Sequence, residues 1–277
     1  MVSIAYLLRF IEDDAPKGDI TSDVIIPDVD CQAVIRVEEA GIIAGLDETA
    51  ALFSHFAVSV TSDRNDGDTV NPGDILLSLK GDAKKVLLVE RTVLNIIGRM
   101  SGIATRTREL GNLVRSKNPS CRIAATRKTC PGFGVLDKKA VLIGGGDPHR
   151  ANLSEGFLIK DNHLAIVPLQ EAVRRAKEYS AYKKVEVEVE TGEDAVLAVE
   201  AGADIILLDN MSPGQVADTL MLLKNAGLRD RVAVEVSGGI DENTLAGYAA
   251  SGADVISMGS LTHTVRNFSV TLEILSK

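Results

Sequence analysis

The stretch Ala203-Asp204-Ile205-Ile206-Leu207-Leu208-Asp209 is a short apolar run that ends on a carboxylate. Five similar runs lie between Cys121 and Ser260, and each leads into a charged or glycine-rich group. They are Cys121–Ala125, Gly156–Ile159, Val185–Val189, Val232–Val236 and Ala253–Met258. Buried parallel strands read as near-continuous apolar runs, and in βα folds the reactive groups gather where the strands end. The pattern therefore predicts a parallel sheet or barrel with one functional mouth.

Helical segments alternate with these runs, which is the pattern that produces right-handed βαβ crossovers. The segments are Leu169–Tyr179, Asp194–Ala201, Pro213–Asn225 and Glu242–Ser251. Six strands are too few for the standard eight-stranded barrel. We therefore predict an α/β fold with an incomplete (β/α) barrel that other elements complete, and an open doubly wound sheet remains the alternative.

The first 110 residues have a different pattern of apolar and polar residues. Gln32–Glu39 alternates like a half-exposed strand, and Lys84 to Met100 carries a wide apolar helical face. We expect Ser101–Gly102 to interrupt this helix before a second helical run that extends to Val114. These features predict an α+β module with an antiparallel sheet.

We divide the chain into three parts on this basis. Residues 1–110 form the predicted N-terminal α+β domain, and residues 111–264 form the catalytic incomplete barrel. Residues 265–277 are apolar enough to pack back on the first domain.

Composition excludes several classes of protein. The chain has 277 residues, 45% of them hydrophobic, which is ample for a buried core. A net charge of −9, 4% aromatic residues and no Trp argue against a nucleic-acid surface. No apolar run approaches the roughly 20 residues of a membrane helix, and the acidic N-terminus is unlike a signal peptide. Three widely separated cysteines indicate no disulfide framework. We expect a cytoplasmic protein without a nucleic-acid or membrane partner.

Carboxylates alternate with valine in the run that contains Val185–Val189. Period-two alternation puts Glu186, Glu188 and Glu190 on one face, which is either the barrel interior or the solvated face of an edge strand. Asp209, at the end of the Ala203–Leu208 run, favours the interior. Two carboxylates at adjacent strand ends, Glu188 and Asp209, are suited to Mg²⁺.

Glycines follow the last two apolar runs. Ser237-Gly238-Gly239 comes after one run, and Met258 is followed by Gly259-Ser260. Glycine lets backbone N–H groups approach an anion closely, although a tight turn is the simpler explanation of a single pair. Two such sites late in a barrel-like chain predict a phosphate-binding position.

Basic residues gather in an otherwise acidic chain. Between Arg127 and Lys160 there are six Lys or Arg against three Asp or Glu. Arginine pairs with planar carboxylates while lysine acts as a point charge, so this segment predicts a small polyanionic substrate that carries carboxylates. Lys138 and Lys139 are better interpreted as a solvated helix face. For His149 we favour a hydrogen-bonded structural role over that of a general base.

Taken in order, motifs along nearly the whole chain resemble the quinolinate phosphoribosyltransferase family, also called carboxylating nicotinate-nucleotide pyrophosphorylase. The motifs are Gly18–Thr21, Glu90–Asn95, Ser101–Thr105, Thr126–Thr129 with Pro131–Gly132, Gly144–Gly146, His149–Arg150, Leu158–His163, Glu186–Glu188, Leu208–Asn210, Ser237–Gly239 and Leu261–His263.

The resemblance implies a type II phosphoribosyltransferase with an N-terminal open sandwich and an incomplete barrel. Such enzymes convert quinolinate and 5-phosphoribosyl 1-pyrophosphate to nicotinate mononucleotide, pyrophosphate and CO₂ in NAD biosynthesis, with Mg²⁺ as cofactor. Lys128, Lys160, Glu188 and Asp209 would be catalytic.

The resemblance also implies binding roles for individual residues. The quinolinate carboxylates and the pyrophosphate would be held by Arg91, Thr126, Arg127, Lys128, His149, Arg150 and Lys160. Glu188 and Asp209 would serve the metal and the ribose hydroxyls, and the 5-phosphate would lie against Ser237, Gly238, Gly239, Met258, Gly259 and Ser260. Arg91 would reach into the site of a neighbouring subunit, which implies a homodimer or a hexamer built as a trimer of dimers.

Two departures from the family pattern keep alternatives open. The family usually has Arg where Gly134 stands and Asp where Asn267 stands. One alternative is a relative of the same fold that acts on another aromatic acid, such as nicotinate. The other is a non-catalytic binding homologue, including a related group associated with molybdenum transport. Members of that group tend to lack the lysine that is present here as Lys160, so Lys160 favours quinolinate.

Overall fold

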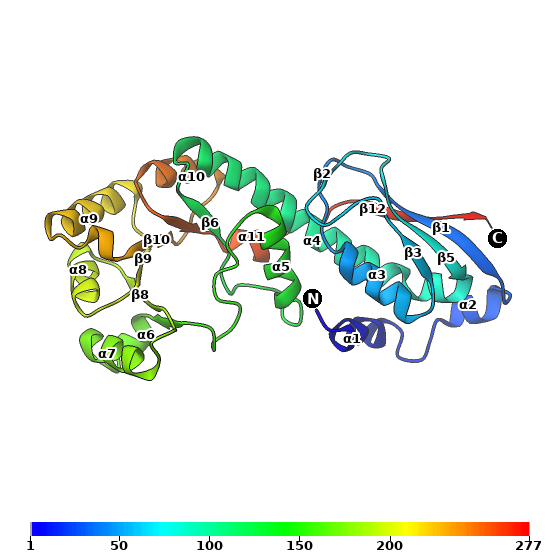
Figure 1. Ribbon diagram of the computed structural model, residues 1–277, viewed down its shortest axis with the longest axis horizontal. Helices are drawn as coiled ribbons and strands as arrows, with labels where there is room; N and C mark the ends of the chain where they lie inside the picture. The colour runs from blue at the N-terminus through cyan, green and yellow to red at the C-terminus, as the bar shows by residue number, and fades with distance from the viewer. Residues whose placement is uncertain (1, 277) are drawn as a thin grey trace. The chain divides into compact units, whose positions relative to one another are not determined.

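The computed structural model describes residues 2–276, which divide into two compact units (Figure 1). The first unit comprises residues 2–108, 130–145 and 264–276, and the second comprises residues 109–129 and 146–263. The segment 130–145 thus lies in the first unit, although it fell within residues 111–264 of the sequence-based division. Among the described residues, no helix combines the length and the apolar character that crossing a membrane requires.

The second unit is built on a six-stranded parallel sheet with helices along its outer side (Figure 1). Its strands are β6 (Arg122–Ala124), β7 (Phe157–Ile159), β8 (Val185–Val189), β9 (Ile205–Asp209), β10 (Ala233–Ser237) and β11 (Val255–Ser257). Its helices are α6 (Asp161–Leu164), α7 (Leu169–Tyr179), α8 (Gly192–Glu200), α9 (Pro213–Asn225), the 3₁₀ turn η1 (Arg229–Arg231), α10 (Glu242–Ala250) and α11 (Ser260–His263).

The strand order is β6-β11-β10-β9-β8-β7, so chain neighbours from β7 to β11 are also sheet neighbours. The first strand, β6, closes onto the last, β11, through the pairs Val255↔Arg122 to Ser257↔Ala124. Within the described chain β6 and β7 are the two ends of the sheet. The incomplete barrel predicted from six apolar runs is therefore confirmed.

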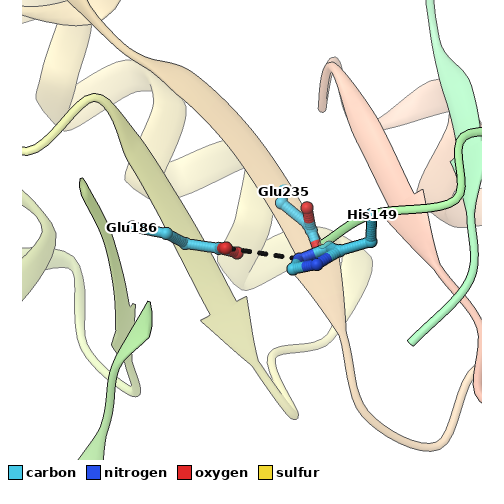
Figure 2. A group of neighbouring side chains, drawn as sticks. All are labelled: His149, Glu186 and Glu235. Atoms are coloured by element: carbon cyan, nitrogen blue, oxygen red, sulfur yellow. Dashed lines mark ion pairs between the residues drawn. The ribbon is translucent and has the colours of Figure 1, made fainter. Parts of the chain in front are cut away.

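Alternation along the strands separates two sets of side chains. Val185, Val187 and Val189 of β8 join the apolar core that also contains residues of the surrounding helices. Glu186 and Glu235 face the other way and are nearly fully buried, at 4% exposure each, in the barrel interior (Figure 2). The interior placement is therefore confirmed for Glu186 and for Glu188, which lines the cavity at the strand ends, whereas Glu190 follows the end of β8 and is exposed. β8 is not an edge strand because it lies between β7 and β9.

Two aspartates at strand beginnings fix the register of neighbouring strands. Asp204, before β9, accepts hydrogen bonds from the backbone N–H of Val185 at 2.7 Å and from Lys177 Nζ at 2.7 Å. Asp254, before β11, accepts from the backbone N–H of Val234 at 2.7 Å and from the Arg229 guanidinium at 2.8 Å. A one-residue slip would exchange core and interior side chains, so these pairs protect the alternation on which the site depends.

The first unit contains an antiparallel sheet in the order β12-β1-β5-β3, which confirms the predicted α+β module (Figure 1). The strands of this unit are β1 (Asp30–Val37), β2 (Gly41–Ile42), β3 (Ser59–Thr61), β4 (Thr69–Val70), β5 (Ile75–Asp82) and β12 (Val270–Ser276). Its helices are α1 (Ile4–Asp14), α2 (Ile20–Ile25), α3 (Leu46–His55), α5 (Gly134–Gly144) and most of α4 (Ala83–Lys117), whose residues from 109 onward belong to the second unit.

The C-terminal strand β12 belongs to this first sheet. It pairs antiparallel with β1 from Val37↔Val270 to Gln32↔Ser276. Lys277, the last residue of the segment 265–277, lies outside the described residues.

The predicted interruption of the long helix at Ser101–Gly102 is wrong, because α4 is continuous through both residues. The Ser101 hydroxyl accepts from the Ala44 N–H at 2.9 Å and donates to the Ala44 carbonyl at 3.1 Å. A Cβ on Gly102 would lie 2.1 Å from the carbonyl oxygen of Arg266. The small residues therefore do not break the helix. They allow the backbone at Ala44 and at Arg266 to approach it closely.

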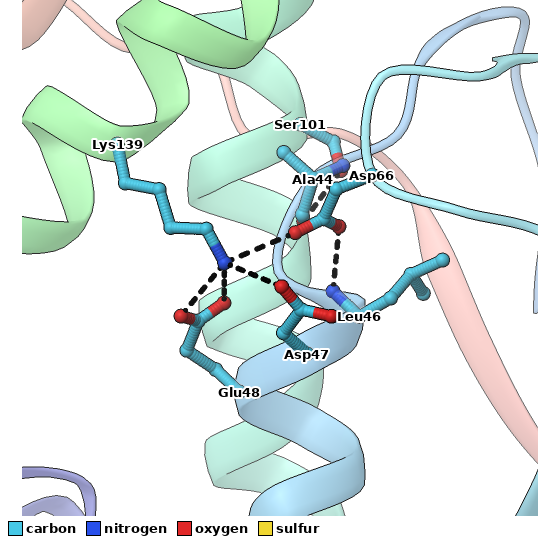
Figure 3. Close-up of polar contacts among 7 residues, drawn as sticks. All are labelled: Ala44, Leu46, Asp47, Glu48, Asp66, Ser101 and Lys139. Atoms are coloured by element: carbon cyan, nitrogen blue, oxygen red, sulfur yellow. Dashed lines mark hydrogen bonds and ion pairs between the residues drawn. The ribbon is translucent and has the colours of Figure 1, made fainter. Parts of the chain in front are cut away.

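The interpretation of Lys138 and Lys139 as a solvated face is also wrong. Lys138 is only 5% exposed. Lys139 makes ion pairs with Glu48 at 2.9 Å, Asp47 at 3.1 Å and Asp66 at 3.2 Å (Figure 3). Burial lowers the pKa of Lys139, but the hydrogen bond and charge of Glu48 outweigh this and raise that pKa above its ordinary value. These contacts attach α5 to α3 inside the first unit.

We predict that Gly102→Ala destabilises the protein by about 1–3 kcal/mol, because the new methyl group would overlap the Arg266 carbonyl. Helix propensity alone predicts the opposite sign, a gain of about 1 kcal/mol. Gly111→Ala is the matched control in the same helix, since its Cβ would meet mainly the flexible Arg115 guanidinium, at 3.2 Å. Urea unfolding of both variants checks this, and a Gly102→Ala protein as stable as Gly111→Ala would contradict the close-approach explanation.

Candidate active site

A cavity of about 420 Å³, here called the mouth cavity, lies within the second unit at the carboxyl ends of its strands. Its size falls in the range of small-molecule sites. It is lined by Thr126, Arg127, Lys128, His149, Arg150, Leu158, Lys160, Glu188, Leu207, Asp209, Glu235 and Ser237. Nine of these twelve were named as site residues from the sequence, so the structure brings most of that set into one place.

The cationic part of the mouth cavity combines residues from three segments. Arg127 and Lys128 follow β6, Arg150 precedes β7, and Lys160 follows it. Burial lowers the pKa of Arg150, and the positive charge of Arg127 lowers it further. The Nε atom of Arg150 is buried without a hydrogen-bond partner among the described residues. Two guanidinium groups that repel one another around an unpaired donor form a place suited to an anion.

The acidic part of the mouth cavity is formed by Glu188 of β8 and Asp209 of β9. Burial raises the pKa of Glu188, the charge of Asp209 raises it further, and the charge of Lys160 opposes both. The two carboxylates are therefore close enough to repel. Asp209 accepts a hydrogen bond from the side chain of Asn210 at 2.7 Å.

A divalent cation fits this pair chemically. Mg²⁺ prefers one or two protein carboxylates and fills its remaining positions with water and phosphate oxygens. The Mg²⁺ prediction from Glu188 and Asp209 stays a prediction.

The glycines after β10 and β11 lie next to the mouth cavity. Gly238 has a φ of 99°, and a Cβ there would lie 2.3 Å from the side-chain oxygen of Asn210. Gly259 is packed so tightly that a Cβ would lie 3.0 Å from the side chains of Lys128 and His263. Of this group only Ser237 lines the cavity itself, while Gly238, Gly239, Met258, Gly259 and Ser260 do not, and Met258 is buried.

The N-terminus of α10, which follows the β10 glycines, is already capped. Asp241 precedes α10, and its carboxylate accepts from the Thr244 N–H at 2.9 Å. One donor of that helix end is therefore occupied by a protein carboxylate.

Arg91 is the one predicted site residue that belongs to the other unit. It is exposed on α4 and does not line the mouth cavity.

Sequence reasoning missed Glu235, which lines the mouth cavity and also contacts charged groups in the barrel interior. His149 Nε2 lies 3.2 Å from a Glu186 oxygen and 3.5 Å from a Glu235 oxygen (Figure 2). The Ser257 hydroxyl donates to Glu235. Burial raises the pKa of Glu235 to about 7, and the charge of Glu186 adds to the effect. The missed signal was alternation in β10, which places Glu235 on the same face as Ser237.

The ligand atoms of His149, Glu186 and Glu235 lie within 4.8 Å of one another, as in a metal centre. The Nδ1 atom of His149, however, accepts the backbone N–H of Arg150 at 2.7 Å. An imidazole nitrogen that accepts carries no proton, so Nε2 keeps the proton and donates to the carboxylates. This hydrogen-bond pattern disfavours a metal ion at Nε2 and agrees with a structural role for His149.

The fold and this site together define an α/β-barrel protein with a cavity suited to a small anionic ligand at its strand ends. Two family models match the chain, the quinolinate phosphoribosyl transferase N-terminal domain over residues 19–101 and the C-terminal domain over residues 103–273. The chain therefore belongs to the quinolinate phosphoribosyl transferase family.

Individual relatives agree over the full chain. A protein of Methanothermobacter thermautotrophicus named probable nicotinate-nucleotide pyrophosphorylase [carboxylating] is 46% identical over 270 residues, which are 96% of each chain. A nicotinate-nucleotide pyrophosphorylase structure from Francisella tularensis is 32% identical with a TM-score of 0.89, over 99% of this chain and 98% of that one. The corresponding structure from Ehrlichia chaffeensis is 29% identical with a TM-score of 0.91, over 99% of both chains.

We predict that Glu235 makes the stability of the protein fall as pH rises from about 4.5 to 7. Its folded pKa of about 7 exceeds its ordinary value of 4.5. Below pH 4.5 the Glu235 carboxyl is protonated in both the folded and the unfolded protein. Above pH 4.5 the unfolded protein releases this proton first, which favours unfolding.

Glu235→Gln cannot ionise, so its stability relative to the wild type should increase by about 2 kcal/mol between pH 5 and pH 8. Urea unfolding at the two pH values checks this, with Glu200→Gln as an exposed control. The same difference from wild type at both pH values would show that Glu235 titrates normally in the folded protein.

Proposed function

We propose that this chain transfers the phosphoribosyl group of 5-phosphoribosyl 1-pyrophosphate to quinolinate, releasing pyrophosphate and CO₂ and forming nicotinate mononucleotide. It would act as a pentosyltransferase of NAD biosynthesis. The single observation that carries the proposal is the mouth cavity, in which Arg127, Arg150 and Lys160 share one space with Glu188 and Asp209. The names of the relatives and the family models point to the same reaction.

Quinolinate would be held by the cationic part of the cavity. Its two carboxylates require more positive charge than a monocarboxylate does, and arginine forks match carboxylates in two parallel hydrogen bonds. The unpaired Arg150 Nε and the mutual repulsion of Arg127 and Arg150 would both be relieved by such a ligand. This surplus of cations favours quinolinate over nicotinate.

The ribosyl donor would occupy the acidic and glycine-rich part. Ser237, Gly238 and Gly239, together with Met258, Gly259 and Ser260, would surround the 5-phosphate. The glycine N–H groups would be the donors, because the Met258 N–H already donates to the Ala124 carbonyl at 2.9 Å. Glu188 and Asp209 would hold Mg²⁺, which neutralises charge on the departing pyrophosphate. The same two carboxylates would tolerate positive charge on the ribose as the bond to pyrophosphate breaks.

The transfer itself needs only positioning and electrostatics from the protein. The quinolinate ring nitrogen attacks C1 of the ribose while the bond to pyrophosphate breaks, and Lys128 and Lys160 would stabilise the anions on either side. The ring nitrogen is then cationic. The bond from C2 to its carboxylate breaks, its electron pair stays on C2 beside the cationic nitrogen, and C2 takes a proton from solvent as CO₂ leaves.

We further propose that the active form is a homodimer, or a hexamer made of dimers, in which Arg91 enters the site of a neighbouring subunit. Its exposed position on α4 and its absence from the mouth cavity are compatible with a role in another copy. We also propose that the enzyme acts in the cytoplasm.

The purified protein, incubated with the ribosyl donor, Mg²⁺ and either quinolinate or nicotinate, tests the function directly. We expect nicotinate mononucleotide from quinolinate, with one CO₂ released per product. Product from nicotinate alone would indicate the related monocarboxylate activity, and no product from either acid would favour a binding homologue.

We predict that Arg127→Met and Lys160→Met each lower kcat/KM for quinolinate about 10- to 100-fold. A charge-assisted contact to a bound anion is worth about 1.5–3 kcal/mol, and neither change removes buried packing. Lys224→Met, on the exposed side of α9, is the charge-matched control. Steady-state kinetics checks the prediction, with an unchanged Tm as evidence that each variant is folded. Wild-type kinetics in both variants would show that these residues do not belong to the site.

We predict that Asp209→Asn raises the Mg²⁺ concentration needed for half-maximal activity, because it removes one of two anionic oxygen donors. A Mg²⁺ titration of the initial rate at saturating substrates measures this. Asp218→Asn, exposed on α9, has the same charge change outside the cavity. An unaltered metal dependence in Asp209→Asn would count against its role as a ligand.

A further inference from the structure

We infer that Glu186 is a positioning residue for substrate binding, which holds the His149 ring in one tautomer and thereby fixes Arg150 in the mouth cavity. The inference rests on the proposed function, because it names a residue that prepares the quinolinate site without touching quinolinate.

The His149 ring is engaged by protein groups through both nitrogens. Nδ1 accepts the backbone N–H of Arg150 at 2.7 Å, and Nε2 faces Glu186 at 3.2 Å. Because Nδ1 accepts, Nε2 must carry the proton, and Glu186 is its nearer carboxylate acceptor. Glu235 is the second acceptor, at 3.5 Å.

The backbone at His149 also requires support. Its φ is 54°, which is the left-handed region that residues with a side chain rarely adopt. Such a conformation costs of the order of 1–3 kcal/mol and persists where the surroundings over-determine it. Among the contacts that hold this turn are the bond from the Arg150 N–H to the ring and the bond from the His149 N–H to Asp147 at 2.9 Å.

This turn decides where Arg150 points. The guanidinium of Arg150 donates to the Gly156 carbonyl at 3.1 Å and lines the mouth cavity, with Nε unpaired. If the ring lost its acceptor and changed tautomer, Nδ1 would become a donor and could no longer accept the Arg150 N–H. The backbone conformation that presents Arg150 to a quinolinate carboxylate would then lose one of the hydrogen bonds that support it.

The burial of Glu186 is not explained by a contribution to the stability of the fold. It is 4% exposed, and its Oε1 atom has no hydrogen-bond partner among the described residues. A buried carboxylate with an unpaired oxygen is unfavourable for folding. Its contact with His149 gives this residue a purpose in the site.

The test compares Glu186→Met, which keeps the length of the side chain but removes the acceptor, with Glu186→Gln, whose amide oxygen can still accept from Nε2. We expect Glu186→Met to raise KM for quinolinate roughly tenfold, the effect of losing one such hydrogen bond, with kcat and KM for the ribosyl donor changed much less. Glu186→Gln should restore near wild-type KM, and exposed Glu200→Met should not differ from wild type.

The tautomer itself is read by ¹⁵N NMR of the histidine rings without substrate, with His149→Gln to assign the signal among the four histidines. Wild type and Glu186→Gln should show a protonated Nε2 and an unprotonated Nδ1, and Glu186→Met should show a mixture. A protonated Nδ1 in the wild type, or an unchanged KM in Glu186→Met, would overturn the inference. If wild type makes no product from quinolinate, the proposed function fails, while the NMR result still decides the arrangement of His149.

Discussion

The second unit depends on offsetting the repulsion between two carboxylates that are buried in the barrel interior. Alternation along β8 and β10 gives their valines to the helix-covered core, and the same geometry forces Glu186 and Glu235 into the interior. Two buried carboxylates repel, and each loses its hydration. Two donors offset this unfavourable burial, namely Nε2–H of the neutral His149 ring and the Ser257 hydroxyl. Burial also raises the pKa of Glu235, so that this carboxylate loses its charge more readily. The offset is incomplete, because Oε1 of Glu186 has no hydrogen-bond partner among the described residues.

This interior layer prepares the mouth cavity above it. Arg150 and His149 are consecutive, so a hydrogen bond to the histidine ring is also a restraint on the arginine. On β8, Glu188 comes two residues after Glu186 and therefore points to the same side of the sheet, nearer the carboxyl end of the strand. Groups that would contact substrates, such as Arg150 and Glu188, thus lie one or two residues along the chain from groups that support them. Catalytic sites gain accuracy from such supporting contacts.

Much of this arrangement could be predicted from the sequence because it follows from local patterns. The apolar runs predicted the parallel strands, and the polar residues at or just after their ends predicted Glu188, Asp209 and Ser237 at one mouth. Glu235 was missed because it sits inside an apolar run and not at its end, and only the pairing of β10 with β9 and β11 shows that it faces Glu186 and His149. The break at Gly102 and the solvated Lys139 were wrong for a related reason. Each depends on a distant segment, the Arg266 carbonyl and the Asp47–Glu48 pair, that no local periodicity contains.

The open seam between β6 and β7 has a consequence for how this chain can be divided. The connection between these strands leaves the second unit at residue 130 and returns at residue 146, and the excursion folds with the first unit, where Asp137 pairs with Arg99 at 2.8 Å. Neither unit is therefore a continuous stretch of polypeptide. A chimaera of two relatives joined at a single crossover near residue 102 would combine α5 of one parent with α3 and the N-terminal part of α4 of the other. Exchange between relatives would have to transfer residues 130–145 together with the N-terminal part of the chain to keep these contacts matched.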